Sequence, residues 1–381
     1  MKIFFAGDYA PCRRYENIVL EKRKSIFGNL MDDILESDIS FVNLETPLSI
    51  TGKPIKKSGP NIKAHPDCIH ALADAGFSVV GLANNHILDF GEKGLEETLN
   101  ACRKVGVSTC GAGKSLHEAQ QPLVIEKDGI KVGYIAVAEH EFSIAEKESG
   151  GAAPLDPIDN SLLIENLRKN VGLLFVTIHG GNEYFPYPRP GLRKICRFYV
   201  EKGADAVICH HAHVPGAYEV YKGKPIVYSL GNLIFDHPNP PNGWNQGYAF
   251  RLEYVKNSMT LSSFKLIPYT QSVKQGGVLR IADKERENFL QIIESYRDVL
   301  TTEKKYENLW LEFCEKKRTS ALLNMFLPFR VKGIGRVYDI LKIEDIIVPE
   351  KYLFKRQNML RCESHIELFN TILKDKIENR K

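Results

Sequence analysis

Paired cysteines and long apolar runs are both missing from the sequence. Its eight cysteines are scattered along 381 residues without a CxxC pair. This spacing excludes a zinc knuckle or a disulfide scaffold, and we expect buried free thiols in a reducing compartment. No run of about 18 apolar residues predicts a membrane-spanning helix, and the apolar stretch that breaks at Gly7 is too short for a signal peptide. We therefore expect a cytoplasmic protein, or one that acts at the inner face of the membrane.

Strong net charge is missing as well. The formal net charge is +4, which is too small to indicate a nucleic acid or membrane partner. The excess lies in the last part of the chain, where 17 Lys/Arg stand against 12 Asp/Glu from Glu303 onward, compared with 34 against 35 before it. Basic clusters there, such as residues 316–318 and 354–356, are most simply a solvated surface. The alternative is contact with a protein partner or an anionic polymer.

Apolar strand patterns alternate with helical patterns over most of the chain. Helices are predicted near residues 92–105 and 190–202, each followed by a glycine. Hairpins are predicted at residues 123–137 and 248–269, and the polar segment 139–160 is predicted to be a loop. This order of elements is typical of a layered α/β sandwich.

The pattern changes to long helical stretches beyond about residue 280. We therefore predict two parts, an α/β domain over residues 1–270 and a mainly helical extension over residues 271–381. The extension is expected to contribute no metal ligand, because its histidine and carboxylates follow no strand.

Three histidines fall within four positions at the end of a predicted buried strand, in the segment His210-His211-Ala212-His213. On an extended chain, His211 and His213 point to the same side, while His210 faces the opposite way and is given a structural role. Two neutral imidazoles held side by side suit a shared cation. For an isolated pattern of this kind a polar loop is the simpler interpretation. Further candidate ligands elsewhere in the sequence are needed to favour a metal site.

Four other predicted strands also end in polar side chains. Strand ends of layered α/β folds face a common crevice, where ligands bind. Carboxylate, imidazole and amide groups are ligands of divalent metal ions. Each residue taken alone could instead cap a turn or bond to the core, but together they favour a site for two ions that share one carboxylate: Asp8, Glu45, Asn85-His86 and His179.

This pattern resembles the CapA family of poly-γ-glutamate capsule synthesis proteins, which is itself similar to the calcineurin-like metallophosphoesterases. Six motifs carry the resemblance, in family order, over roughly residues 1–265: GD at 7–8, FVNLETP at 41–47, GLANNHILDFG at 81–91, HGGNEY at 179–184, GADAVICHHAHV at 203–214 and KPIVYSLGNLIFD at 224–236.

The resemblance implies a four-layer αββα sandwich with one or two divalent ions, manganese, iron or zinc. By position it implies Asp8 and a bridging Glu45 as carboxylate ligands. The remaining implied ligands are the Asn85 amide and three imidazoles, those of His179, His211 and His213. It also implies that His86 meets the substrate, and Asp89, three residues on, can hold the His86 ring in one orientation.

One departure from the wider phosphoesterase pattern stands out. Ala10 occupies the position two residues after Asp8 where that pattern has a histidine. One ion therefore loses a ligand, and water or the second oxygen of a carboxylate has to replace it. Asn84, Glu183 and Asn232 are predicted to contact the substrate, with a supporting or loop-fixing role as the alternative.

Two functions remain open on this evidence. The first is a metal-dependent hydrolase that attacks a phosphoester or a γ-glutamyl amide, with an anionic polymer or a phosphorylated small molecule as substrate. The second is a non-catalytic metal-binding factor that assembles with capsule synthesis proteins. The link to capsule or surface polymer comes from family resemblance, since the site residues do not specify it.

Overall fold

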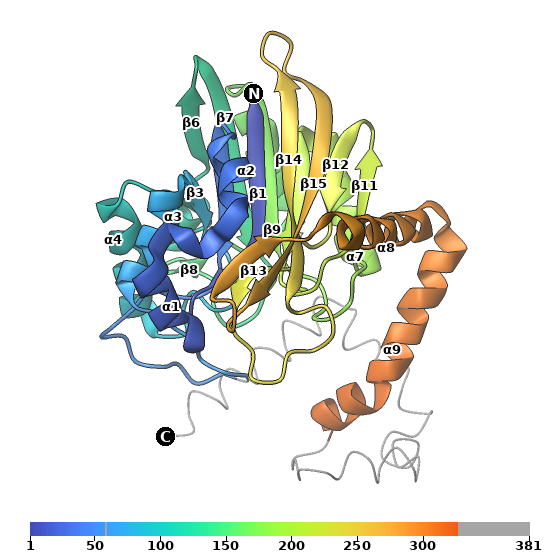
Figure 1. The fold of residues 1–381 in the computed structure, drawn as a ribbon. Helices are drawn as coiled ribbons and strands as arrows, with labels where there is room; N and C mark the ends of the chain where they lie inside the picture. The colour runs from blue at the N-terminus through green and yellow to red at the C-terminus, as the bar shows by residue number, and fades with distance from the viewer. Residues whose placement is uncertain (58, 327–381) are drawn as a thin grey trace. The chain divides into compact units, whose positions relative to one another are not determined.

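The computed structural model describes residues 1–57 and 59–326. Two β-sheets form its centre (Figure 1). The first sheet has the strand order β16-β15-β14-β1-β2-β3-β4, with β13 also paired to β1. Its strands are β1 (Lys2–Ala10), β2 (Ile39–Leu44), β3 (Val79–Gly81), β4 (Ser108–Cys110), β13 (Asn232–Phe235), β14 (Gln246–Val255), β15 (Thr260–Ser272) and β16 (Gly277–Arg280).

The second sheet has the order β11-β12-β10-β9-β7-β6. Its strands are β6 (Leu123–Lys127), β7 (Ile130–Ala138), β9 (Leu173–His179), β10 (Ala206–His210), β11 (Tyr218–Tyr221) and β12 (Lys224–Val227). A small antiparallel pair, β5 (Ala112–Gly113) and β8 (Gly151–Ala152), lies apart from both sheets.

Aromatic side chains pack the two sheets face to face. Phe5 of β1 contacts Phe175 of β9 edge-on, with ring centroids 5.3 Å apart, and Phe41 of β2 stacks on Tyr134 of β7 at 6.1 Å. All four rings are fully buried. Because side chains alternate along a strand, the neighbouring Phe4 faces the other side of the first sheet. A continuous run of large apolar residues in β1 therefore fits a strand buried on both faces.

Helices cover the outer faces of both sheets. On the first sheet, Phe77 lies between Phe4 and Phe27, with ring centroids 6.3 Å and 5.6 Å away. On the second sheet, Cys196 of α7 lies against Cys209 of β10. The layers are thus helix, sheet, sheet, helix, which confirms the predicted four-layer αββα sandwich. The helices are α1 (Arg14–Lys22), η1 (Arg23–Leu30), α2 (Met31–Leu35), η2 (Pro66–Cys68), α3 (Ile69–Ala75), α4 (Gly91–Lys104), α5 (Leu116–Ala119), α6 (Pro157–Arg168) and α7 (Pro190–Lys202).

The chain divides into two compact units at Thr302. The predicted boundary at residue 270 falls inside β15, and the first unit also includes β16 and α8 (Asp283–Thr301). Phe289 and Ile293 of α8 are buried in the same core as the sheets. The second unit begins with α9 (Glu303–Phe326). The rest of the predicted helical extension, including the basic cluster at 354–356, lies outside the described residues.

Most of the predicted elements are confirmed. Both hairpins form, β6 with β7 and β14 with β15, and α4 and α7 match the predicted helices. The loop predicted at 139–160 is partly wrong, because it contains β8 and the start of α6 at Pro157. Asp156 caps α6 by accepting hydrogen bonds from the backbone N–H groups of residues 158 and 159. An aspartate before a proline is typical of a helix start, but the glycines and prolines of the segment favoured the prediction of a loop.

The described cysteines are free thiols, and six of the seven are buried, as the scattered spacing predicted. Across residues 1–57 and 59–326, no helix combines the length and the apolar character needed to cross a membrane.

The inter-sheet core makes a stability prediction. Phe175 contacts three buried rings, those of Phe5, Tyr134 and Tyr254, so Phe175→Ala should lower the free energy of unfolding by about 3–5 kcal/mol. Urea denaturation measures this loss. Phe142→Ala is the matched control, because Phe142 is 45% exposed and its removal should change stability by about 0.5 kcal/mol or less. Equal losses in the two variants would contradict the predicted core.

Candidate metal centre

The predicted ligands lie where the carboxyl ends of parallel strands from both sheets meet. Strands β1 and β2 run parallel in the first sheet and β9 and β10 run parallel in the second. Asp8 lies near the end of β1, Glu45 directly follows β2, and His179 is the last residue of β9. The turn after β3 carries Asn85, and the chain after β10 carries His211 and His213.

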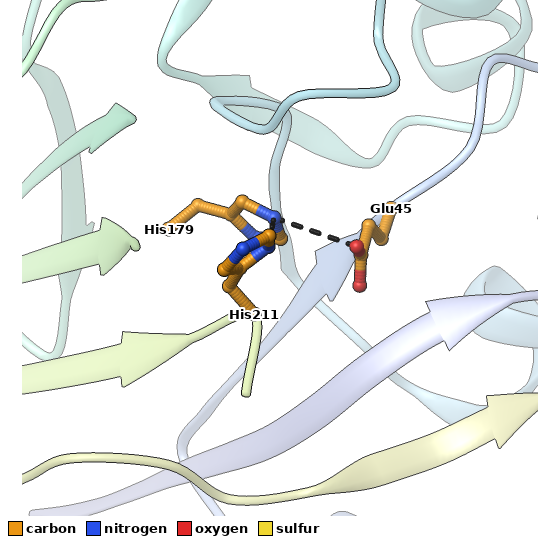
Figure 2. Close-up of side chains that lie close together, drawn as sticks. All are labelled: Glu45, His179 and His211. Atoms are coloured by element: carbon orange, nitrogen blue, oxygen red, sulfur yellow. Dashed lines mark hydrogen bonds and ion pairs between the residues drawn. The ribbon is translucent and has the colours of Figure 1, made fainter. Parts of the chain in front are cut away.

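These side chains form two groups that share Glu45. The first group, called site 1 below, is Asp8, Glu45 and His213, and the core of the second, site 2, is Glu45, His179 and His211. Within each group the candidate ligand atoms all lie within 4.8 Å of one another. Figure 2 shows site 2, in which His179 Nε2 lies 3.4 Å from Glu45 Oε1. His213 Nε2 lies 3.6 Å from the same oxygen.

Glu45 has the environment of a carboxylate that needs a cation. It is fully buried, and neither of its oxygens has a hydrogen-bond partner. Burial, reinforced by the negative charges of Asp8 and Glu183, raises the pKa of Glu45 well above its usual range. A buried ionised carboxylate without donors is strongly unfavourable unless a positive charge compensates it. The residues present therefore fit a divalent ion on either side of Glu45.

Asp8 is held differently. Burial alone would raise its pKa, but the His210 and His213 side chains keep the pKa of Asp8 well below its usual range. Asn43 Nδ2 donates to Asp8 Oδ1 at 2.7 Å, and the His211 backbone N–H donates to Oδ2 at 3.3 Å. Both Asp8 oxygens thus accept one hydrogen bond each, and the replacement of the missing histidine by water or by a second carboxylate oxygen stays a prediction.

Asn85 lies beside site 2, and its role as a ligand stays a prediction. Its Oδ1 lies 3.1 Å from His179 Nε2, and His211 Nδ1 lies 3.1 Å from the same nitrogen. Burial, followed by the neighbouring His211, lowers the pKa of His179 well below its usual range. Burial and His213 likewise lower the pKa of His211. Both rings are therefore neutral at pH 7, the state in which imidazole binds a metal.

The chain at the histidine cluster is not extended, which corrects the alternation argument. Strand β10 ends at His210, and His211 and His213 have φ values of 92° and 59°. Non-glycine residues in this region are strained by about 1–3 kcal/mol each. The two rings thus reach the site through strained turns. His210 faces inward too: its Nδ1 lies 3.1 Å from Asp8 Oδ1, although neither ring nitrogen makes a well-directed hydrogen bond.

His86 and Asp89 form the pair predicted from the sequence. His86 Nδ1 lies 2.7 Å from Asp89 Oδ2, and Asp89 is fully buried. Burial lowers the pKa of His86 and the Lys57 ammonium adds to this, while Asp89 acts in the opposite direction. The His86 backbone N–H donates to Asn84 Oδ1 at 3.1 Å, which fixes the turn that carries the ring.

The predicted substrate contacts fall in three different environments. Asn84 is fully buried and donates to the carbonyl of Leu44 at 2.8 Å, so it braces the turn and leaves no polar group for a substrate. Asn232 is also fully buried, and its Oδ1 lies 3.0 Å from His213 Nδ1, which orients that ring. Glu183 is exposed at the edge of the site. Of the three, Glu183 alone is exposed, and its contact with a substrate stays a prediction.

Sequence reasoning missed three residues that touch the site. Asn43 is buried and lies 3.2 Å from His179 Nδ1 as well as bonding to Asp8. Glu141 accepts from Asn85 Nδ2 at 3.1 Å and lies 3.6 Å from His211 Nε2. Lys57 reaches His86 from a loop. Asn43 could have been found by alternation, because it stands two residues before Glu45, whereas nothing local identifies Glu141 or Lys57.

Comparison with solved structures finds weak overall likenesses. A phosphatase from Mycoplasma pneumoniae covers 71% of this chain and 93% of its own, with a TM-score of 0.47 at 14% identity. A 5′-nucleotidase precursor from Thermus thermophilus covers 73% of this chain and 55% of its own, with a TM-score of 0.44 at 13% identity.

Comparison with curated proteins finds closer relatives. The PGA biosynthesis protein CapA of Bacillus subtilis (strain 168) is 32% identical over 249 residues, which are 64% of this chain and 64% of that protein. The capsule biosynthesis protein CapA of Bacillus anthracis is 30% identical over 58% of this chain and 55% of its own length. The matched region thus spans less than two thirds of either relative.

The family described as "Bacterial capsule synthesis protein PGA_cap" matches residues 2–237, more than half of the chain. The chain therefore belongs to the PGA_cap family.

Proposed function

We propose that the chain is a metal-dependent hydrolase in which two divalent ions share Glu45. One observation carries this proposal: a fully buried carboxylate with no hydrogen-bond donor lies between two sets of candidate ligands. Asp8, Glu45 and His213 would hold an ion at site 1. At site 2 the ligands would be Glu45, Asn85, His179 and His211, a mixture of carboxylate, amide and imidazole that suits manganese, iron or zinc.

Bound divalent ions supply Lewis acidity and activate water for attack on a phosphoryl or acyl group. The chain's own residues supply orientation and a proton. Asn232 fixes the His213 ring through Nδ1 and leaves Nε2 toward Glu45. Asp89 holds the Nδ1 side of His86, so the Nε2 side remains for a leaving group, which His86 would protonate.

The names of the relatives suggest the biological setting. Two of them are described as a PGA biosynthesis protein and a capsule biosynthesis protein, which supports a substrate drawn from a capsule or surface polymer or its precursor. Poly-γ-glutamate would present a γ-glutamyl amide, whereas a polysaccharide precursor would present a phosphoester. Both bonds are open to attack by an activated water.

A non-catalytic assembly factor is the second candidate, and Ala10 favours it. Without a histidine at this position, site 1 has three protein ligands, and Asp8 contributes to it with one oxygen already bonded to Asn43. A centre of this kind could hold one ion for structure and assemble with other capsule synthesis proteins.

Metal analysis combined with an activity screen separates the two candidates. The purified chain should retain manganese, iron or zinc by inductively coupled plasma mass spectrometry. With manganese added, it should hydrolyse either p-nitrophenyl phosphate esters or γ-glutamyl peptides. Bound metal with no turnover of either class would favour the assembly factor, and a chain that binds no metal at all would rule out the proposed centre.

Glu45→Gln should remove metal binding at both sites while stabilising the metal-free protein. The substitution keeps the shape of the side chain but removes a buried carboxyl group that has no hydrogen-bond partner and that favours the protonated form in the metal-free fold. We expect metal-free Glu45→Gln to be more stable than metal-free wild type at pH 7 by about 1–3 kcal/mol, the range for an unsatisfied buried group. Calorimetric titration with zinc and denaturation in a chelator measure the two effects.

The stability difference should depend on pH in a defined direction. The pKa of Glu45 is raised in the folded state, so the folded chain binds a proton that the unfolded chain releases above its pKa of about 4.3. The free energy of unfolding of the wild type therefore falls relative to that of Glu45→Gln as the pH rises from the unfolded-state pKa toward the raised folded-state pKa. Below the unfolded-state pKa, the two proteins should have similar stabilities. A gap that widens toward acid pH would contradict the unpaired carboxylate.

His86→Ala should reduce turnover without removing metal. General acid–base groups typically contribute about 10²–10⁴-fold in rate, and the loss should fall in kcat while metal content stays at the wild-type level. His211→Ala should instead lose metal and activity together, and the exposed His117→Ala is the neutral control. If His86→Ala also lost metal, His86 would be a ligand. Unchanged kcat would mean that the proton comes from another group.

A further inference from the structure

Lys57 is a buried lysine in the loop that joins β2 to η2. Its side chain is 3% exposed, whereas Lys53 and Lys56 in the same loop are exposed. Removing an ammonium group from water is unfavourable unless a partner compensates it. The loop therefore buries the side chain of Lys57 alone among its three lysines just named, and the groups that contact its ammonium should compensate for the loss of water.

The partners of Lys57 are the two residues that form the proposed proton-donating pair. Lys57 Nζ forms an ion pair with Asp89 Oδ1, and it lies 3.1 Å from His86 Nδ1. Asp89 Oδ2 lies 2.7 Å from the same ring nitrogen. An ammonium can only donate and a carboxylate can only accept, so Nδ1 finds a partner whether or not it carries the hydrogen. Neither residue has a contact with Nε2 in the described structure.

The loop is tied to the same turn by its backbone. The Ile55 N–H donates to the Asp89 carbonyl at 3.0 Å, and Asn61 Nδ2 donates to that carbonyl at 2.9 Å. The Ile62 N–H donates to Asp89 Oδ2 at 2.8 Å. These bonds flank Lys57 on both sides along the chain. These hydrogen bonds hold the loop against the turn that carries His86, and they thereby fix the position of the Lys57 ammonium group.

We propose that Lys57 is a positioning residue for His86: with Asp89 it holds the Nδ1 edge of the ring and leaves Nε2 for the substrate. This inference rests on the hydrolase proposed above. Lys57 acts through the ring and does not itself touch the substrate. The alternative is that Lys57 is merely the counter-ion of Asp89, or that it binds an anionic substrate directly.

A double-mutant cycle tests this role in the full chain with manganese and p-nitrophenyl phosphate, or with whichever substrate the screen identifies. Lys57→Met should lower kcat by about 10-fold or more, within the contribution of a general acid, with KM and metal content unchanged. In a His86→Ala background, Lys57→Met should have no further effect, because it acts through the ring. A similar loss in both backgrounds, or a raised KM, would overturn the proposal in favour of direct substrate binding.

Nitrogen NMR of the ring tests the same role without any activity, so it still applies if the hydrolase proposal fails. In metal-free protein labelled with ¹⁵N-histidine, the His86 signals are assigned by their loss in His86→Ala. Lys57→Met should shift the His86 ring nitrogens and leave those of His179 and His213 in place. Lys56→Met, the exposed neighbour, should shift none of them. Unshifted His86 signals in Lys57→Met would overturn the proposal.

Lys57→Met leaves Asp89 buried without its counter-ion and could fail to fold for that reason alone. The comparison is then made between Asp89→Asn and Asp89→Asn/Lys57→Met, in which the buried carboxylate is gone. Lys57 still contacts Nδ1 in the first of these, so its removal should again shift the His86 ring signals. Identical His86 signals in the two variants would show that Lys57 serves Asp89 alone.

Discussion

The site depends on one buried carboxyl group, that of Glu45, whose oxygens have no hydrogen-bond partner. It directly follows β2 of the first sheet, and two of the imidazoles around it come from β9 and the end of β10 in the second. The ionised form is tolerable only if a cation joins these groups, because burial otherwise raises the pKa of Glu45 and favours its protonated form. A bound cation would thus link the two sheets, which also pack on each other through the Phe5 and Phe175 rings. Rigid packing beneath keeps the ligand atoms at fixed separations, which a metal centre requires.

Strain and unsatisfied polarity are concentrated at this end of the sheets. His211 and His213 have left-handed backbone conformations, and Glu45 and His210 carry buried atoms with no well-directed hydrogen bond. Such features persist only where surrounding structure enforces them, and they gather at functional sites. Here the enforcing structure is the parallel pairing of β9 with β10 and the apolar core behind it. Metal binding would recover part of this energy, which is why removal of the Glu45 charge should stabilise the metal-free chain.

Local pattern predicted a layered α/β sandwich, the hairpins and the strand-end polar residues, whereas the four-layer order came from the family resemblance. The apolar run that ends at Leu44-Glu45, for example, predicted the end of β2. Lys57 could not be predicted, because its burial depends on a loop that folds back onto the Asp89 turn through long-range hydrogen bonds. His210 was assigned away from the site by strand alternation. That rule assumes extended backbone, and it fails where the chain turns at His211.

The two proposed sites are unequal, yet one buried amide, that of Asn43, contacts both. At site 2 four side chains converge, whereas site 1 lacks a histidine at Ala10. Asn43 Nδ2 also bonds to Asp8 Oδ1 and lies 3.2 Å from His179 Nδ1, so one amide touches a candidate ligand of each site. Asn43 thus connects the Asp8 and His179 side chains through two buried contacts. Under the proposed function, fewer protein ligands at site 1 would leave more positions for water or substrate, and the reacting group would then lie on the Asp8 and His213 side.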